Sequence, residues 1–522
     1  MTVKNSGTTL KTQYVYDADD RKTQTQAKSK TLTTAYDALG RFDTKTWNTV
    51  TPFVTKYHYM AGANGSQSSQ VASVDIGSQK IAYTYDGNGN ITSITDSQGT
   101  TTYAYDELNR LVRENNHQLG KTVTYLYDAA GNIQKKCTYA LTNEQTLPAS
   151  PEATSVYAYD DVWRDKLVSV DGKAITYDAI GNPLTYGAWS MEWTQGKRLA
   201  SMNSGDGGNT LMFTYDESGM RLSKLDFAGN KNHKYTIAGD KLTGERCENM
   251  DGSVLYTTQF VYDSAGEAVS MVYNGVEYYF VRNGQRDVIG LIDGNGNIVV
   301  NYTYDSWGRL LKVEGNTELG YRNPLRYRGY IADDETDLYY VGSRYYAPVI
   351  GRWISADDVE TLTNNSLDNK NLYAYCDNNP VNRVDKKGDF WGALAIAGST
   401  AATAFGIFGV VLATVLVVVL VVEAVELTKD VIKYAKGKKK SKEKAKQKSE
   451  NSKPRSSEPP ARRVRCNTRK KAKEAAIRAG KGKKPRNDYH DPKGAHFHPN
   501  VVNGARKTPK GSGFHDHYFY PR

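Results

Sequence analysis

The sequence predicts a mainly β protein: a long array of β-hairpins followed by C-terminal segments of a different character. Three observations support this fold class. The dipeptide Tyr-Asp recurs from about residue 10 to residue 310, the chain contains 38 tyrosines against 12 phenylalanines together with 46 glycines, and the composition changes abruptly after residue 389. Tyrosine favours strands and glycine favours turns. With 522 residues the chain is long enough for several domains or for one large repetitive domain.

The repeat unit ends in Tyr-Asp followed by a turn that often contains Gly-Asn or Gly-Arg. Apolar and polar residues alternate around it, as in residues 81–85 and 91–94, which is typical of β-hairpins. One unit cannot bury its apolar face alone, so stacked units should form a continuous sheet. The repeats are Tyr16-Asp17, Tyr36-Asp37, Tyr85-Asp86, Tyr105-Asp106, Tyr127-Asp128, Tyr177-Asp178, Tyr215-Asp216, Tyr262-Asp263 and Tyr304-Asp305.

The aspartates of the repeats have two interpretations. Paired carboxylates can perform acid–base chemistry or bind metal ions, but here each Asp recurs together with its turn. An Asp at the start of a turn normally accepts hydrogen bonds from nearby backbone N–H groups. We therefore expect these aspartates to stabilise turns.

Residues 319–389 separate the repeats from the C-terminal segments and carry a specific set of motifs. The block contains Arg344-Tyr345-Tyr346, Gly351-Arg352-Trp353-Ile354-Ser355, Asn371-Leu372-Tyr373-Ala374-Tyr375 and Asn379-Pro380. In this order they resemble the core domain that closes Rhs/YD-repeat proteins, bacterial polymorphic toxins related to the C components of Tc toxins. The resemblance spans residues from about 10 to 389. It implies a hollow β-shell over residues 1–318, closed by a plug over residues 319–389; the repeats alone also allow an open β-solenoid or a propeller.

The resemblance also implies an aspartyl autoprotease in the plug. Members that cleave themselves use two acids and a helper arginine, which fall here on Asp357, Asp385 and Arg344, and the cut would follow Asp389. Two carboxyl groups would share a proton, one activating water and the other protonating the leaving group. The second motif departs from the family pattern, because Asp385-Lys386-Lys387-Gly388-Asp389 lacks its proline and its leucine. Two alternatives therefore stay open: a plug that has lost the cut, or Asp358 in place of Asp357.

Residues 390–434 are predicted to form a hydrophobic transmembrane or translocation segment. Residues 390–422 contain no charged side chain, and a run of this length exceeds the roughly 20 residues that span a bilayer. Lys429, Lys433 and Lys436 follow closely, as on the positively charged side of a membrane helix. A single helix, a helical hairpin and a segment buried inside the shell are the alternatives.

Residues 435–467 form a basic linker rich in Lys, Ser and Pro, a composition typical of disorder. The formal charge of +11 is concentrated in this part of the chain and beyond it, so a polyanionic partner is expected only there. Four widely spaced cysteines argue against a disulfide framework or a zinc ribbon. The chain begins inside a repeat and without a signal peptide, from which we expect a fragment or a C-terminal cassette.

Residues 468–522 contain five of the eight histidines, four of them in two His-x-His pairs. Residues two apart on a strand point to one face, so two neighbouring strands can gather four imidazoles. These groups can act as general acid and base on RNA, or they can hold a divalent metal ion that activates water, with Asp491 or Asp516 as a further ligand. The catalytic candidates are His490, His496, His498, His515, His517 and Asp516, and the metal candidates are His496, His498, His515 and His517. The candidates for nucleic-acid binding are Lys493, Arg506, Lys507, Lys510, Tyr518 and Tyr520.

The sequence thus favours a secreted or surface-associated toxin cassette of the Rhs/YD-repeat type, whose C-terminal domain is a nuclease, with RNA as the favoured substrate. Such a cargo would act in the cytoplasm of a competing cell and would require a cognate immunity protein. Two alternatives remain: a surface or wall-associated repeat protein whose tail only binds, and a toxin that damages membranes through residues 390–440. The delivery apparatus is not indicated by the sequence.

Overall fold

The computed structural model describes residues 2–5, 8–62, 66–263, 265–357, 371–388, 391–393, 463–465, 486–488, 496–498 and 517–519. The chain divides into two compact units, Met1–Leu412 and Ala413–Arg522. Within the described residues the first unit is almost entirely antiparallel β-structure, and α1 (Thr317–Arg322) is its one α-helix. The predicted mainly β fold is confirmed.

Two long sheets dominate the first unit, and in each sheet every strand pairs with its neighbours in sequence. The first sheet contains β3 (Gln13–Tyr16), β4 (Lys22–Gln26), β5 (Thr31–Tyr36), β6 (Phe42–Trp47), β7 (Phe53–Ala61), β8 (Gln67–Ile76), β9 (Gln79–Tyr85), β10 (Ile91–Thr95), β11 (Thr100–Tyr105), β12 (Leu111–Asn116), β13 (Lys121–Tyr127), β14 (Ile133–Ala140), β15 (Ala153–Tyr159), β16 (Leu167–Val170) and β17 (Lys173–Ala174). The second sheet contains β18 (Thr185–Tyr186), β19 (Trp189–Thr194), β20 (Arg198–Ser204), β21 (Thr210–Tyr215), β22 (Arg221–Asp226), β23 (Lys231–Ala238), β24 (Lys241–Asn249), β25 (Val254–Tyr262), β26 (Ala268–Tyr273), β27 (Val276–Arg282), β28 (Val288–Ile292), β29 (Ile298–Tyr304) and β30 (Leu310–Gly315). Two such meanders differ from the solenoid and the propeller that the repeats alone allowed. A separate hairpin, β1 (Thr2–Asn5) and β2 (Thr8–Lys11), precedes them.

Most Tyr-Asp dipeptides connect a turn to the hairpin before it. In one repeat, Asp106 Oδ1 accepts the N–H groups of Leu108 (3.0 Å) and Arg110 (2.9 Å), and Asp106 Oδ2 accepts Arg110 Nε (2.6 Å). The hydroxyl of Tyr105 donates to the carbonyl of Ile91 (2.7 Å), the first residue after the preceding turn. The same hydroxyl–carbonyl bond joins Tyr36 to Lys22, Tyr59 to Phe42, Tyr85 to Val71, Tyr127 to Leu111, Tyr159 to Ile133, Tyr215 to Leu199, Tyr262 to Leu242 and Tyr304 to Val288.

These contacts explain the unusual tyrosine content. Phenylalanine would fill the same space but would leave a backbone carbonyl without its donor in the partly buried wall. The prediction that the repeat aspartates stabilise turns is confirmed.

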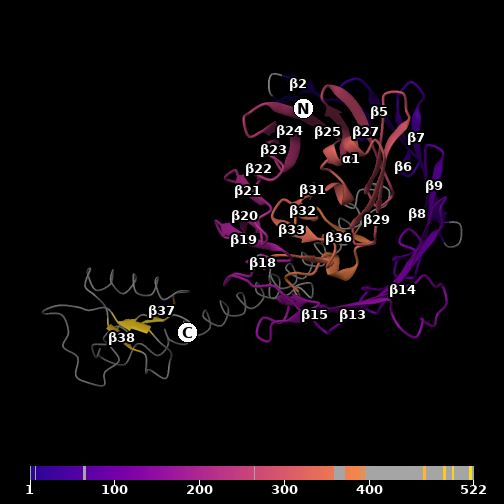
Figure 1. Ribbon diagram of the computed structural model, residues 1–522. Coiled ribbons are helices and arrows are strands. Elements are labelled where there is room, and N and C mark those ends of the chain that lie inside the picture. The colour runs from indigo at the N-terminus through magenta and orange to yellow at the C-terminus, as the bar shows by residue number, and fades with distance from the viewer. Residues whose placement is uncertain are drawn as a thin grey trace, which may run out of the picture. The chain divides into compact units, whose positions relative to one another are not determined.

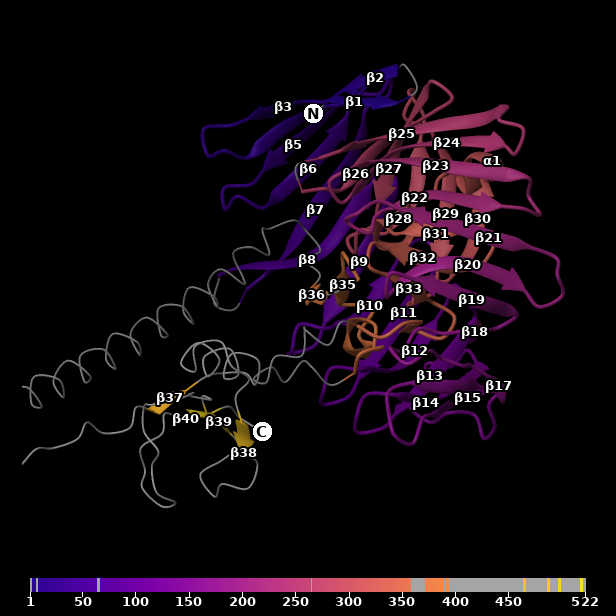
Figure 2. The same ribbon diagram turned by 90° about the vertical axis from the view of Figure 1, so that its left-hand side faces the viewer.

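The wall closes because the first hairpins of the first sheet meet the last third of the second sheet. The hydroxyl of Tyr14 on β3 donates to the carbonyl of Tyr262 on β25 (2.8 Å), and the N–H of Val50 donates to the carbonyl of Gly294 (3.0 Å). The rings of Trp47 and Tyr279 lie 4.4 Å apart, between β6 and β27. Figure 1 shows the two sheets surrounding the segment that holds β31, β32, β33 and β36, and Figure 2 shows the strands stacked along the wall.

The described residues from α1 to β36 lie within this wall. They form α1, the 3-10 turn η2 (Tyr327–Gly329), a sheet of β31 (Ile331–Asp333), β32 (Leu338–Val341), β33 (Arg344–Ala347) and β34 (Arg352–Trp353), the turn η4 (Cys376–Asn378), and the hairpin of β35 (Arg383–Asp385) and β36 (Trp391–Ala393). We call residues 319–388 the core segment. Every aromatic side chain of β32 and β33 is less than 5% exposed, so the segment supplies much of the apolar interior.

The core segment binds the turns of both sheets. Tyrosine hydroxyls donate to turn carbonyls of the second sheet, from Tyr339 to Gly308 (2.8 Å) and from Tyr346 to Trp307 (2.7 Å). Asparagine amides donate to turn carbonyls of the first sheet, from Asn378 to Gly131 (2.7 Å) and from Asn379 to Asn109 (2.7 Å). The Tyr-Asp turns therefore stabilise the wall and also form the docking surface for the core segment.

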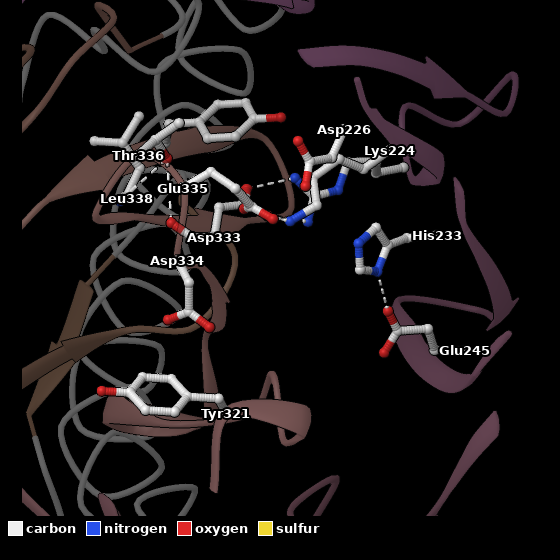
Figure 3. Close-up of polar contacts among 12 residues, drawn as sticks. Lys224, Asp226, His233, Glu245, Tyr321, Asp333, Asp334, Glu335, Thr336 and Leu338 are labelled. Atoms are coloured by element: carbon white, nitrogen blue, oxygen red, sulfur yellow. Dashed lines mark hydrogen bonds and ion pairs between the residues drawn. The ribbon is translucent and has the colours of Figure 1, made fainter. Parts of the chain in front are cut away.

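A buried ionic cluster adds a charged contact between the core segment and the second sheet. Asp333 on β31 accepts both outer guanidinium nitrogens of Arg221 on β22 (2.6 and 3.0 Å) and the ammonium group of Lys224 (3.1 Å), which also binds Glu335 (2.7 Å). The side chains of Arg221 and Asp333 are each 1% exposed. Figure 3 shows Asp333 and Glu335 facing Lys224, with His233 and Glu245 nearby.

His233 carries a further buried charge on the neighbouring strand β23. Its Nδ1 binds Glu245 Oε1 at 2.6 Å. Burial pushes the pKa of His233 down, but hydrogen bonds with Cys247 and Glu245 outweigh this effect and raise the pKa to about 9. The imidazole is therefore protonated at neutral pH and forms an ion pair with Glu245.

The stability of the first unit should consequently fall as the pH rises from about 6.5, the value for histidine in an unfolded chain, to about 9. A group whose pKa is higher in the folded chain than in the unfolded chain stabilises the fold. This contribution is complete below the unfolded pKa and is lost as the pH rises through the folded pKa. The full loss is roughly 3 kcal/mol. Urea midpoints measured across this range for the wild type and for His233→Gln should converge at the alkaline end. Parallel curves would contradict the assignment, and His58→Gln, at a half-exposed pair, serves as the control.

Candidate active site

Arg344 brings together the two acids that the resemblance assigned to an autoprotease. Its Nη2 lies 3.0 Å from Asp357 Oδ2 and 3.5 Å from Asp385 Oδ2. Arg344 begins β33, Asp357 follows β34, and Asp385 ends β35, so three separate elements meet at one nitrogen atom. The side chains are 5%, 18% and 3% exposed, respectively. The structure thus brings together all three residues named from the sequence, while Asp358 lies outside the described residues.

The guanidinium group of Arg344 is fixed on its other sides. It lies over the ring of Trp353, 4.3 Å from the centroid, and Nη1 donates to the carbonyl of Leu372 (3.0 Å). Its Nε donates to the carbonyl of Gly388. A planar, permanently charged fork can make all of these contacts at once, whereas a lysine ammonium cannot.

Each acid also has its own anchor. Asp385 Oδ1 accepts the N–H groups of Lys387 (3.2 Å) and Gly388 (2.7 Å), and its carbonyl accepts the hydroxyl of Tyr330 (2.5 Å). The N–H of Asp357 donates to the carbonyl of Leu372 (3.0 Å). One oxygen of Asp385 therefore organises the turn that leads to Gly388, while the other faces Arg344.

A cavity of about 1320 Å³ adjoins the acids, and Arg344, Asp357 and Lys386 are among the residues that line it. Water can therefore reach the 18% exposed carboxylate of Asp357. One buried and one partly exposed carboxyl group beside one cation, with access for water, are the components that hydrolysis by an acid pair requires.

The predicted cut lies between the strands of a hairpin. β35 pairs with β36 in antiparallel register, with Asp385 opposite Trp391 and Arg383 opposite Ala393. The predicted cut separates Asp389 and Phe390, which lie outside the described residues. Residues 391–393 were predicted to belong to the hydrophobic segment, but they form a strand of the first unit.

The second unit is described only at four short strands, β37 (Arg463–Arg465), β38 (Arg486–Asp488), β39 (His496–His498) and β40 (His517–Phe519). β39 pairs with β40 in antiparallel register, with His496 opposite Phe519 and Phe497 opposite Tyr518. The backbones of the two His-x-His regions thus lie on neighbouring strands. The remaining candidates, His490, Asp491, Lys493, Arg506, Lys507, Lys510, His515, Asp516 and Tyr520, lie outside the described residues.

Two further expectations concern membranes and metals. In the parts of the chain that the structure describes, none of the helices is sufficiently long and apolar to span a bilayer. Residues 394–434 of the predicted hydrophobic segment lie outside those parts. A search of the described residues likewise finds no cluster of His, Cys, Asp or Glu side chains suited to a metal ion.

The fold agrees with comparisons to known proteins. The Teneurin YD-shell family matches residues 1–164 and 100–381. The tRNA3(Ser)-specific nuclease WapA of Bacillus spizizenii is 33% identical over 298 residues, which cover 57% of this chain and 12% of that protein. The double-stranded DNA deaminase toxin A of Burkholderia cenocepacia is 27% identical over 353 residues, covering 61% of this chain and 22% of that protein. The chain thus spans less than a quarter of the length of these relatives.

Among solved structures, the crystal structure of TcdB2-TccC3 has a similar fold. Its TM-score is 0.55, with 20% sequence identity over 73% of this chain and 22% of that chain. At this identity the likeness concerns the fold, and the fold is that of a β-shell.

Proposed function

Because the chain belongs to the Teneurin YD-shell family, we propose that it is a self-cleaving toxin container, whose shell holds a C-terminal cargo and separates it by a cut after Asp389. One observation carries the proposal. Arg344 Nη2 contacts both Asp357 and Asp385, while the same guanidinium binds the carbonyl of Gly388, one residue before the cut. The site thus joins two acids and a buried cation to the backbone that leads to the predicted cut.

The cut would be a hydrolysis of the peptide bond between Asp389 and Phe390. One carboxylate takes a proton from water, and the resulting hydroxide adds to the carbonyl carbon of Asp389. The other carboxyl group gives its proton to the nitrogen of Phe390, after which the C–N bond breaks. The products are a carboxylate at Asp389 and a free amine at Phe390. Arg344 holds both acids in place and offsets the negative charge that they share.

Mass spectrometry of the purified full-length chain tests this proposal. We expect two fragments, of which the first ends at Asp389. The fraction cut should grow at a rate independent of protein concentration, because both acids and the bond belong to one molecule. An unbroken chain, or a cut at another bond, would contradict the proposal.

For the cargo, residues 468–522, we propose a nuclease that favours RNA. Relatives named as a tRNA nuclease and a DNA deaminase toxin support a nucleic acid as the substrate. The adjacent strands β39 and β40 carry His496, His498 and His517, and Lys493, Arg506, Lys507 and Lys510 supply positive charge for phosphates. Secretion, action in the cytoplasm of competing bacteria, contact-dependent inhibition and a cognate immunity protein all belong to this proposal.

The cargo proposal predicts cleavage of RNA by the purified chain. His498→Ala and His517→Ala should each reduce the rate by about 10²-fold or more, since each removes a general acid or base. His58→Ala on β7 is the matched control and should not change it. Loss of activity in a chelator would assign the histidines to a divalent metal ion. Leakage of liposomes that depends on residues 390–440, without RNA cleavage, would instead support the membrane-acting toxin, and a chain inactive in both assays would support a repeat protein that only binds.

A further inference from the structure

We propose that Ser343 is a positioning residue for the self-cleavage, an inference that rests on the proposed function. Its hydroxyl oxygen lies 2.8 Å from the carbonyl oxygen of Gly388 and 3.0 Å from that of Lys387. Its N–H also donates to the carbonyl of Lys387 (3.1 Å). Ser343 ends the turn before β33 and directly precedes Arg344, so the residue that binds both acids and the residue that binds the segment to be cut are neighbours in the sequence.

The segment 385–388, which we call the substrate segment, is held along its backbone. Ser343 and Arg344 bind its carbonyls on one side, and Asp385 Oδ1 binds the N–H groups of Lys387 and Gly388 on the other. Every partner is a residue of the acid site or its sequence neighbour. The backbone is therefore held as far as Gly388, the last described residue before the predicted cut.

Gly388 permits this close approach. Its φ is +77°, and a Cβ atom there would lie 2.6 Å from the carbonyl oxygen of Val341 and 2.9 Å from the hydroxyl of Ser343. Any other residue would push the substrate segment away from Val341 and Ser343. This crowding explains why the motif has a glycine at position 388. The proline that the family pattern places after Asp385 is replaced here by Lys386.

Lys386, which replaces the proline of the family pattern, and Lys387 beside it have partners of their own on the second sheet. Lys386 Nζ lies 3.5 Å from Glu267, and Lys387 Nζ lies 3.5 Å from Asp240. The lysine side chains are 51% and 63% exposed, so these pairs add little energy. The backbone contacts of Ser343, Arg344 and Asp385 therefore hold the substrate segment, and the lysine pairs only line its edge.

The rate of self-cleavage in the full-length chain tests this inference. Ser343→Ala should cut about fivefold more slowly, the effect of one lost neutral hydrogen bond. Ser343→Thr keeps the hydroxyl at an exposed position and should restore the rate. The pH at half-maximal rate and the thermal midpoint should not change, since neither acid is altered. Ser190→Ala removes a similar hydroxyl–carbonyl bond on β19 and is the matched control, together with Asp240→Asn at the exposed lysine pair.

A second readout separates this inference from the proposed function. In the uncut Asp357→Asn chain, Ser343→Ala should expose Lys387 to a lysine-specific protease and speed that cleavage by about the same factor. Equal self-cleavage in Ser343→Ala and the wild type would overturn the positioning role while the acid pair stands. A wild-type chain that never cuts itself would overturn the proposed function and with it this role, and equal protease cleavage would show that the hydroxyl does not hold the segment.

Discussion

A full-length chain carrying Asp385→Asn is expected to stay intact where the wild type separates into two fragments. Asparagine keeps an oxygen that can accept the N–H groups of Lys387 and Gly388, which Asp385 Oδ1 binds at 3.2 and 2.7 Å, so the turn should form as before. The variant loses the proton-transfer group, and the rate should fall by about 10³-fold. Asp357→Asn should have a similar effect. Intact mass after a fixed incubation measures both.

Three further variants sharpen this prediction. Asp358→Asn removes the neighbouring carboxyl and should still cut; if it blocks the cut while Asp357→Asn does not, the roles of the two residues are exchanged. Arg344→Lys keeps the charge but cannot bind Leu372 and Gly388 while contacting both acids, so the cut should be slowed by about 10²-fold. Unchanged cleavage in Asp385→Asn would reduce the acid site to a structural contact within the plug.

The repeats and the acids illustrate what the sequence can predict. The bonds of Asp106 lie within four residues, so the periodic Tyr-Asp pattern was enough to predict both hairpins and turns. The acid site was found through short motifs that resemble a known family. The closure of the wall was expected only from that resemblance, because the bond from Tyr14 to Tyr262 joins residues 248 positions apart and has no local signal.

The sequence did not reveal three features, because each depends on contacts between distant positions or on a strand too short to leave a pattern. Ser343 binds Gly388 across 45 positions, and the small hydroxyl residue has no distinctive spacing. β36 lies inside a run of apolar residues that predicts a membrane segment, since a short strand cannot be separated from such a run by hydropathy alone. The ionic cluster could not be predicted, because Arg221 and Asp333 are 112 positions apart and each lies in an ordinary strand pattern.

The second large effect is expected from Asp333→Ala, which should destabilise the first unit by about 3–5 kcal/mol. The substitution leaves Arg221 buried without its carboxylate partner and Lys224 with Glu335 alone, so the desolvation of the two cations is compensated only in part. Burial raises the pKa of Asp333, but the two cations outweigh it and lower the pKa to about 2, so the carboxylate is charged throughout the neutral range. The urea midpoint of the purified chain, followed by tyrosine fluorescence, measures the loss.

Two comparisons distinguish a penalty for unpaired charge from a penalty for lost volume. Asp334→Ala, at the next position, removes a carboxyl that is 42% exposed, and the loss should be smaller even though it pairs with the buried Arg326. Replacing Arg221, Lys224 and Asp333 together with methionine or leucine removes these three buried charges and should recover most of the stability. If the triple variant is as unstable as Asp333→Ala, then the fit of these side chains, rather than their charge, holds β31 against β22. The core segment would in that case depend on the aromatic packing of β32 and β33 and on the tyrosine and asparagine bonds to the turns.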